Sequence, residues 1–344
     1  MQPLRHAKPS KPRNLVFCCD GTANEYGTVN TNVVHLYKRL DNHPDQQISR
    51  YEPGVGTFSP IGLSDSGRAG ILLGKLFGHG LTENIENGYR FLMHHYRTGD
   101  RVYLFGFSRG AYAVRALAGM LQKCGLLRAE QTNLVRYATR LYTGKDNDAE
   151  AAGFAATYGR PCPVHCIGIW DTVKSLGYLY ANRRFFNARL GPHVTHGYHA
   201  LAIDERRPKF EPLLWNEALA EPHQTIEQVW FAGAHADVGG GYEDRGLAEI
   251  SLQWMIDRAA AAGLHLRPDA EPPQPPDPTG VLHEPWNRWS GRALRVAHLG
   301  DRPRSIPDGA RVHQSVRQRR RATEYEPAVL PEAVQWVSGP PGGD

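Results

Sequence analysis

The run Gly106-Phe107-Ser108-Arg109-Gly110 places a serine between two glycines, directly after an apolar segment. A serine hydroxyl becomes a nucleophile when a base removes its proton, and such a serine sits on a sharp turn from a strand into a helix. Flanking glycines leave room for that turn because they have no Cβ. The pattern predicts Ser108 as the nucleophile of a hydrolase. The alternative is a glycine-rich turn in which the serine only caps a helix.

A base and a carboxylate that could serve this nucleophile follow later in the chain. Each of Asp171 and His235 comes shortly after an apolar segment, and the order Ser, Asp, His is the order found in α/β-hydrolases. We expect His235 to be the general base and Asp171 to orient it. Asp204 and Asp237 are alternatives for the carboxylate, and His199 is an alternative for the base. Each could instead have a structural role, such as capping a turn.

Stabilising an oxyanion requires two backbone N–H donors, and the expected donors are Arg109 and either Gly21 or Thr22. Asp20 would repel a negative charge there, so we expect it to point away and to hold its loop by hydrogen bonds. A different interpretation makes Asp20 the nucleophile of a phosphatase, because Asp-Gly-Thr after a strand is similar to part of the haloacid-dehalogenase motif. That motif has a second Asp two residues earlier, where this chain has Cys18.

Apolar runs and helical spacing predict the elements that position these residues. The sequence therefore predicts an α/β fold of the α/β-hydrolase type, with a mostly parallel central sheet and helices on both faces. The glycine-rich segment from Pro53 to Gly80 is expected to be flexible, as a lid or substrate loop. Strands are expected at 14–19, 47–51, 101–107, 164–170 and 226–232, and helices at 32–40, 81–96 and 111–124.

The length of 344 residues favours one main domain over residues 13–344, after a flexible N-terminal segment, 1–12. A proline-rich insertion or surface loop is expected at about 268–280. No window is apolar enough for a transmembrane helix, and the basic, proline-rich start does not look like a signal peptide, so the expected location is cytoplasmic.

The net charge of +5 is too diffuse to indicate a nucleic-acid partner. Its densest basic cluster, Arg317–Arg321, is expected to be a solvated helix face. The five cysteines are an odd number and lie mostly in apolar runs, which favours reduced core residues. Cys162, His165 and Cys166 lack a fourth ligand for zinc, so no metal and no cofactor are expected.

Seven motifs occur in an order that resembles the DUF2235 family, including the catalytic domain of a class of type VI secretion phospholipase effectors. They are Cys18–Thr22, Thr31–Val34, Pro53–Thr57, Gly106–Ala111, Trp170–Val173, His199–Arg206 and His235–Tyr242. The similarity runs from about residue 13 to 262 and resumes at 306–313, so the proline-rich segment is expected to be an insertion within the domain.

The resemblance implies an α/β-hydrolase fold and cleavage of carboxylic esters, including phospholipid acyl esters, through Ser108, Asp171 and His235. Within this sequence nothing provides the additional module with which the secreted effectors engage membranes. A lipid ester with peripheral membrane contact and a small soluble ester therefore both stay open as substrates. Secretion by a type VI system, a housekeeping esterase and a catalytically silent binding module also stay open.

Overall fold

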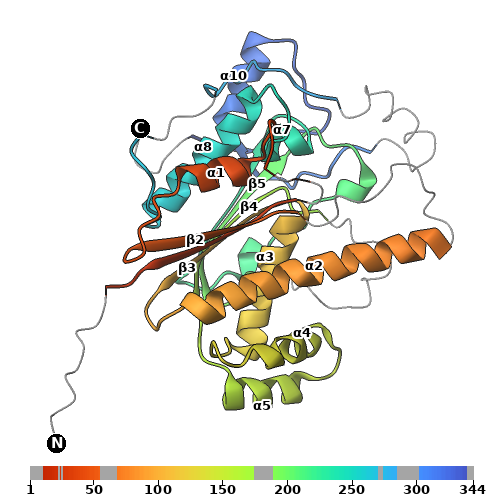
Figure 1. Ribbon diagram of the computed structural model, residues 1–344. Coiled ribbons are helices and arrows are strands. Elements are labelled where there is room, and N and C mark those ends of the chain that lie inside the picture. The colour runs from red at the N-terminus through yellow and green to blue at the C-terminus, as the bar shows by residue number, and fades with distance from the viewer. Residues whose placement is uncertain are drawn as a thin grey trace, which may run out of the picture.

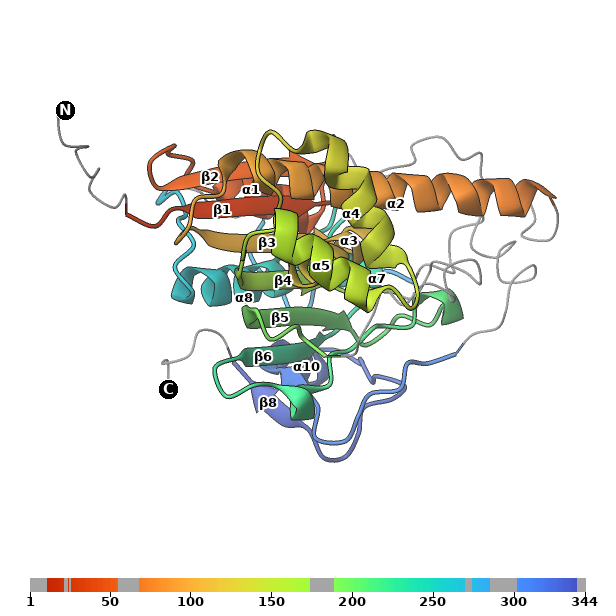
Figure 2. The same ribbon diagram turned by 90° about the horizontal axis from the view of Figure 1, so that it is seen from below.

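The computed structural model describes residues 11–21, 24, 26–54, 68–173, 189–269, 274–284 and 302–338. Within them, eight strands form one sheet in the order β2-β1-β3-β4-β5-β6-β7-β8. Figure 2 shows the succession from β2 through β6, with β8 near the opposite edge. All seven pairings are parallel. The strands are β1 (Asn14–Cys19), β2 (Gln47–Glu52), β3 (Arg101–Phe107), β4 (Val164–Trp170), β5 (Val194–Ala202), β6 (Thr225–Phe231), β7 (Arg311–His313) and β8 (Gln335–Val337).

Helices cover both faces of this sheet (Figure 1). One face carries α1 (Asn32–Arg39), α7 (His235–Gly239) and α8 (Gly246–Ala261), and the other carries α2 (Arg68–His95), α3 (Arg109–Cys124), α4 (Val135–Thr143) and α5 (Asp148–Tyr158). The helix α10 (Gln314–Ala322) lies beside the last strands. A parallel sheet covered on both faces is the arrangement predicted from the apolar runs, and the α/β fold class is confirmed.

Two separate apolar cores result from this layering. One lies between the sheet and α2–α5, with Leu104 and Leu117 among its fully buried side chains. The other lies between the sheet and α1 and α8, and it includes Phe105 and Trp254. Neighbouring residues of β3 thus enter opposite cores, because side chains alternate across a strand.

The register of the strands brings their carboxyl ends level. Phe107 of β3 pairs with Trp170 of β4, which in turn pairs with Ala200 of β5. Hydrogen bonds continue beyond the strand ends, since the Ser108 amide donates to the Trp170 carbonyl at 3.0 Å and the Asp171 amide to the Ala200 carbonyl at 2.8 Å. The residues that follow β3 and β4 are therefore held at one edge of the sheet.

The structure corrects one expectation about loops, for the segment 53–80, and describes only part of the other, the proline-rich stretch at 268–280. The helix α2 begins at Arg68 and not near residue 81, so the expected flexible segment is helical from 68 to 80, while 55–67 lie outside the described residues. In the proline-rich stretch, 270–273 are not described. Its later part contacts the start of α8, where the Asp277 amide donates to the Gly246 carbonyl.

The basic cluster on α10 is not entirely a solvated face. Arg317, Arg320 and Arg321 are exposed, but Arg319 is buried. Its guanidinium donates to the carbonyls of Pro278 and Gly280, at 2.8 and 2.7 Å, and so connects α10 to the proline-rich stretch. The expectation for this cluster was therefore wrong at Arg319.

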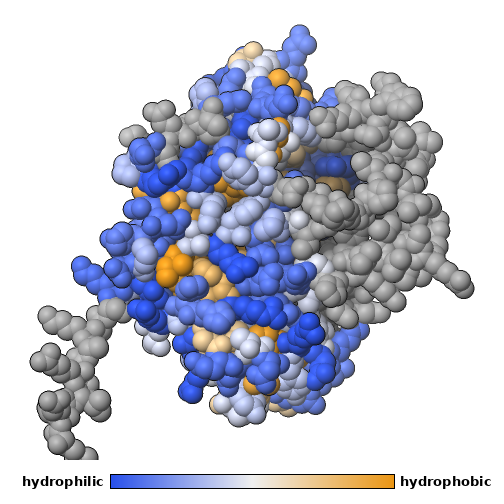
Figure 3. Space-filling model, viewed as in Figure 1, coloured by the Kyte–Doolittle hydropathy of each residue, from blue (hydrophilic) through white to orange (hydrophobic). Residues whose placement is uncertain are grey.

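On the face seen in Figure 3, hydrophobic residues form small scattered groups among hydrophilic ones. Among the described residues, no helix is both long enough and apolar enough to cross a membrane. Residues 1–10 of the expected N-terminal segment lie outside the described residues, and residues 11 and 12 are exposed.

Candidate active site

Ser108 lies on a strained turn between β3 and α3. Its backbone has φ of 56° and ψ of −117°, a conformation that non-glycine residues rarely adopt. A Cβ on Gly106 would lie 2.6 Å from the Ala111 amide nitrogen, and a Cβ on Gly110 would lie 2.1 Å from the Cys19 carbonyl oxygen. Both glycines are therefore required by backbone that passes close to them. This is the geometry of a nucleophile elbow.

The loop after β1 lies directly against this turn. A Cβ on Gly21 would be 3.3 Å from the Cβ of Ser108. The carboxylate of Asp20 accepts hydrogen bonds from the Gly21 amide at 2.7 Å and from the hydroxyls of Thr31 at 2.7 Å and Tyr51 at 2.9 Å. Burial raises the pKa of Asp20 against the effect of these donors. Asp20 thus holds the loop, as expected for a residue that does not face the oxyanion.

The same contact bears on the oxyanion donors. Because the Gly21 amide donates to Asp20, it is not available to a substrate oxygen in this conformation. Thr22, the other candidate from this loop, lies outside the described residues. Arg109 is the first residue of α3, so its amide lies at the positive end of the helix dipole, beside Ser108.

His235 and Asp171 are brought together although two strands, β4 and β5, lie in the sheet between β3, which precedes Ser108, and β6, which precedes His235. His235 Nδ1 lies 2.5 Å from Asp171 Oδ2, and the two side chains are 8% and 0% exposed. The imidazole packs between Phe107 and Phe210, with ring centroids at 4.6 and 4.9 Å. Since Phe107 immediately precedes Ser108, this packing places the histidine ring beside the elbow.

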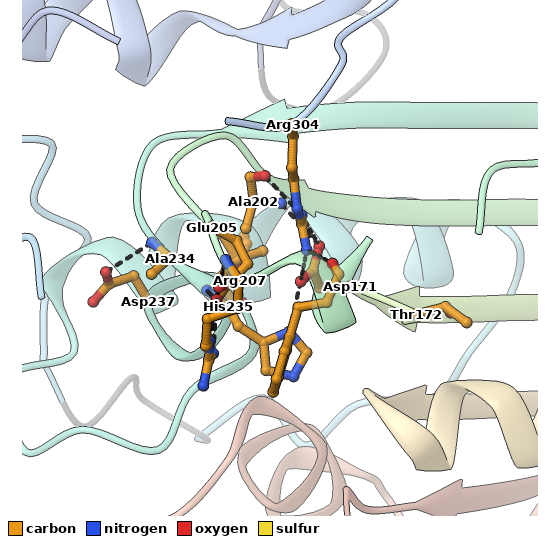
Figure 4. A network of polar contacts seen from close by, with 12 residues as sticks. Asp171, Thr172, Ala202, Glu205, Arg207, Ala234, His235, Asp237 and Arg304 are labelled. Atoms are coloured by element: carbon orange, nitrogen blue, oxygen red, sulfur yellow. Dashed lines mark hydrogen bonds and ion pairs between the residues drawn. The ribbon is translucent and has the colours of Figure 1, made fainter. Parts of the chain in front are cut away.

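A third side chain, Arg304, contacts Asp171 from the side opposite to His235, as Figure 4 shows. Its Nη1 lies 2.6 Å from Asp171 Oδ1 and its Nη2 2.8 Å from Oδ2, while the Ala202 amide donates to Oδ1 at 3.1 Å. Burial by itself would raise the pKa of Asp171, but the Arg304 charge and the His235 hydrogen bond hold it well below its usual range.

An ionised Asp171 can only accept hydrogen bonds, which fixes the tautomer of His235. Nδ1 must then donate to Asp171, which leaves the lone pair on Nε2 in the neutral form of the ring. Arg304 was missed by sequence reasoning, and no local motif marks it. A guanidinium that pairs with a residue 133 positions away is visible only in the folded chain.

Glu205 is a further buried carboxylate near His235 that was not singled out. It accepts from the His235 amide at 3.3 Å and forms a two-point ion pair with Arg207, whose Nε and Nη2 lie 2.8 and 2.7 Å from its oxygens. Burial would raise the pKa of Glu205, but the pairing with Arg207 lowers it. The Arg207 guanidinium also stacks 3.6 Å above the ring of Phe210, which covers His235. This group fixes the start of α7.

The alternative carboxylates point elsewhere. Asp204 accepts from the Gly233 amide and from the Tyr325 hydroxyl, each at 2.7 Å. Asp237 accepts from the Ala234 amide at 2.9 Å, and its other oxygen lies 2.6 Å from His283 Nδ1. Figure 4 shows Asp237 turned away from Asp171. Burial raises the pKa of both alternatives. The hydrogen bonds of both carboxylates thus go to groups other than the His235 ring.

His199 does not have the surroundings of a base. It is fully buried in β5, its Nε2 accepts from the Thr172 amide at 3.3 Å, and its ring packs edge-on against Trp215. Burial lowers the pKa of His199 to about 3, so the ring stays neutral. These contacts indicate a structural histidine behind Asp171.

Metal-binding residues do not gather in the parts of the chain that the structure covers. No group of three or more His, Cys, Asp or Glu side chains there could hold an ion. Cys162 and Cys166 are free, buried thiols, and burial raises their pKa, to about 12 for Cys162. A neutral, buried thiol is a poor metal ligand.

Comparison with known proteins identifies the relatives of this chain. An uncharacterized protein of Saccharomyces cerevisiae is 34% identical over 233 residues, which are 62% of this chain and 34% of the yeast protein. The solved structure of an uncharacterized protein from Pseudomonas aeruginosa is 19% identical, with a TM-score of 0.46, and covers 85% of this chain and 52% of its own. The Tle1 effector bound to the VgrG spike of the type 6 secretion system is 15% identical, with a TM-score of 0.45, over 87% of this chain and 83% of the effector.

The chain thus spans about a third of the yeast protein and about half of the Pseudomonas protein. A family model described as the catalytic domain of the type VI secretion phospholipase effector Tle1-like proteins matches residues 13–258. That range is well over half of the chain and includes the elbow, Asp171 and His235. The protein belongs to the family of Tle1-like phospholipase effector catalytic domains.

Proposed function

We propose that the protein is a serine hydrolase that cleaves carboxylic esters with Ser108, His235 and Asp171. The observation that carries the proposal is the contact of 2.5 Å between His235 Nδ1 and a buried Asp171 carboxylate, beside a serine on a strained elbow. Membership of a family described as phospholipase effector catalytic domains supports the same reaction class.

In the proposed reaction, Ser108 Oγ attacks the ester carbonyl carbon while His235 Nε2 takes the hydroxyl proton. The electron pair of the C=O bond moves to oxygen, and the Arg109 amide stabilises the oxyanion with the help of the α3 dipole. The C=O bond then re-forms as the bond between the carbon and the alcohol oxygen breaks, and His235 gives its proton to the leaving alcohol, so that an acyl-enzyme on Ser108 results. Water repeats these steps on the acyl-enzyme and releases the carboxylic acid.

The proposed substrate class is lipid acyl esters, including those of phospholipids. The family description supports this class, whereas a small soluble ester is the second candidate. Delivery through a type VI secretion system is likewise proposed from the family alone.

A fluorophosphonate probe tests the nucleophile, because it reacts only with an activated serine. The wild-type protein is expected to be labelled and Ser108→Ala to be unlabelled and inactive, while the exposed Ser338→Ala behaves as wild type. Comparing the lipids hydrolysed in extracts by wild type and by Ser108→Ala would then identify the substrate. Labelling of Ser108→Ala at the wild-type rate would refute the proposal.

The carboxylate is tested by comparing three isosteric variants. Asp171→Asn is expected to lower the labelling rate on the order of 10³- to 10⁴-fold, because it favours the wrong histidine tautomer. Asp204→Asn and Asp237→Asn are matched controls, since their partners are other groups, and we expect less than about tenfold change. An equal loss in all three variants would contradict the assignment of Asp171.

Wild type and Ser108→Ala also distinguish two other possible functions. A binding module without activity would fold normally and leave wild type unlabelled. A phosphatase based on Asp20 would release phosphate in a magnesium-dependent reaction that survives Ser108→Ala. The three donors that already hold the Asp20 carboxylate disfavour that second possibility.

A further inference from the structure

The environment of Arg304 is unusual for a residue outside the expected catalytic set. It is 5% exposed, and its two terminal nitrogens contact both oxygens of Asp171. The same nitrogens donate to the carbonyls of Ala202 at 2.7 Å and Phe210 at 2.6 Å. Four acceptors therefore fix the plane of the guanidinium, and the guanidinium in turn fixes the carboxylate.

Arg304 also lies beyond residues 13–258, the part of the chain that the family model matches. The segment that carries it is anchored on both sides. The Arg302 amide donates to the Arg206 carbonyl at 3.1 Å, and Ile306 is buried with Val312 and Val316 in a smaller apolar cluster, separate from the two cores described above. A segment after the matched region thus delivers a charge to the buried carboxylate beside His235.

We propose that Arg304 is a positioning residue that holds the Asp171 carboxylate in the orientation His235 requires and keeps it ionised. This inference rests on the proposed function. The electrostatic reason is the complete burial of Asp171, where a lone carboxylate would take up a proton. A protonated Asp171 would no longer accept from His235 Nδ1, and the base would lose its orientation.

Arg304 has a second effect that makes the proposal testable. In the active form Asp171 is ionised and His235 is neutral, and adding one proton to this pair inactivates it whichever residue takes the proton. The positive charge of Arg304 opposes that proton. Among the described residues, Glu205 and its ion-pair partner Arg207 also lie near His235 and carry opposite charges, and Asp237 of the same helix pairs with His283. Without Arg304, the pair would therefore be protonated at a higher pH.

The experiment measures the rate of fluorophosphonate labelling between pH 5 and 9 for the full-length wild type, Arg304→Met, Arg304→Lys and Arg302→Met. For Arg304→Met, the acid limb of the profile is expected to move up by roughly 1–3 pH units, the usual effect of an arginine on a neighbouring carboxyl. In Arg304→Met, labelling falls about tenfold for each pH unit below the acid limb and recovers by pH 9 the part of the loss that protonation causes. Its maximal rate is expected to stay below that of wild type, because the two-point contact with Asp171 is lost. Arg302→Met, at an exposed position, is expected to match wild type.

Arg304→Lys keeps the charge but loses the two-point contact, so its acid limb is expected within about half a unit of wild type, at a lower maximal rate. This variant also decides the question if circular dichroism shows that Arg304→Met does not fold. A loss that is the same at every pH in Arg304→Met, no loss at all, or a displaced limb in Arg304→Lys would overturn the proposal. Absence of labelling in wild type would instead refute the proposed hydrolase function.

Discussion

The ion pair between Asp171 and Arg304 predicts a strong coupling in stability. Both side chains are buried, at 0% and 3% exposed, so removal of either partner leaves a charge without compensation inside the protein. We expect Asp171→Asn and Arg304→Met each to lower the free energy of unfolding by about 3–5 kcal/mol. The double variant buries neither charge. Its cost should be close to that of one single variant, although the Ala202 and Phe210 carbonyls lose their donor.

The coupling free energy follows from these values. If the two sites were independent, the double variant would lose about 6–10 kcal/mol, so the expected coupling is about 3 kcal/mol or more. Urea unfolding followed by the fluorescence of the seven tryptophans measures the three variants and wild type. The control cycle uses Arg320 and Glu326, an exposed pair at 39% and 71%, for which we expect less than about 1 kcal/mol.

Additive effects at Asp171 and Arg304, within about 0.5 kcal/mol, would refute this reasoning. The double variant also separates stability from catalysis. Its stability should stay close to that of either single variant, well above the additive expectation, and it should still be labelled as slowly as Asp171→Asn, because neither substitution restores a carboxylate to His235.

Two further predictions concern the elbow and a buried histidine. Gly110→Ala should lower stability by about 1–3 kcal/mol or more, because its Cβ would lie 2.1 Å from the Cys19 carbonyl oxygen. The control Gly153→Ala, in α5 with nothing within 4 Å of the added Cβ, should instead raise it by about 0.5–1 kcal/mol. Melting temperatures would show both, and equal shifts would contradict the prediction. Burial lowers the pKa of His199 to about 3. Above pH 6.5 its imidazole is neutral in both the folded and the unfolded chain, so it imposes no penalty on folding. As the pH falls from 6.5 toward 3, the imidazole of the unfolded chain takes up a proton that the folded chain does not, and the free energy of unfolding decreases. His199→Gln should flatten the pH dependence of unfolding by up to about 1.4 kcal/mol per pH unit between roughly pH 6 and 4, and parallel curves in urea titrations would refute this.

The strands that the sequence predicts well are those buried on both faces. In β3 every residue after Arg101 is buried, so the segment is a continuous apolar run. Such a run is easy to recognise. β1 is likewise buried throughout, and β4 is buried except at the half-buried His165. β5 was missed because His196 and His199 interrupt it, although both lie within the sheet. β7 and β8 have three residues each, too few for any periodicity.

The start of α2 was missed for a different reason. Four glycines between Arg68 and Gly80 lower the intrinsic helix propensity, and the segment was interpreted as a flexible loop. Tertiary context overrides such weak local preferences, which are worth about 1 kcal/mol for each glycine. Sequence pattern alone could not supply that context.

For the candidate site, the residues with a local motif were found and those defined by tertiary pairing were not. Ser108, Asp171 and His235 each follow a strand and carry a recognisable neighbourhood. Arg304 stands between a proline and a serine, in a stretch that resembles ordinary surface sequence. Glu205 lies within the motif His199–Arg206, but its contact with the His235 amide depends on how β5 and β6 end side by side.

The separation of Arg304 from Asp171 has a consequence for how the chain is made. A ribosome that adds about 5–20 residues per second needs roughly 7–27 s to cover the 133 positions between them. During that interval the nascent chain already contains the serine elbow and Asp171, and from residue 235 onward the histidine as well. It lacks the guanidinium that neutralises the buried carboxylate. This charge network is therefore completed only after the serine, the aspartate and the histidine have all been synthesised.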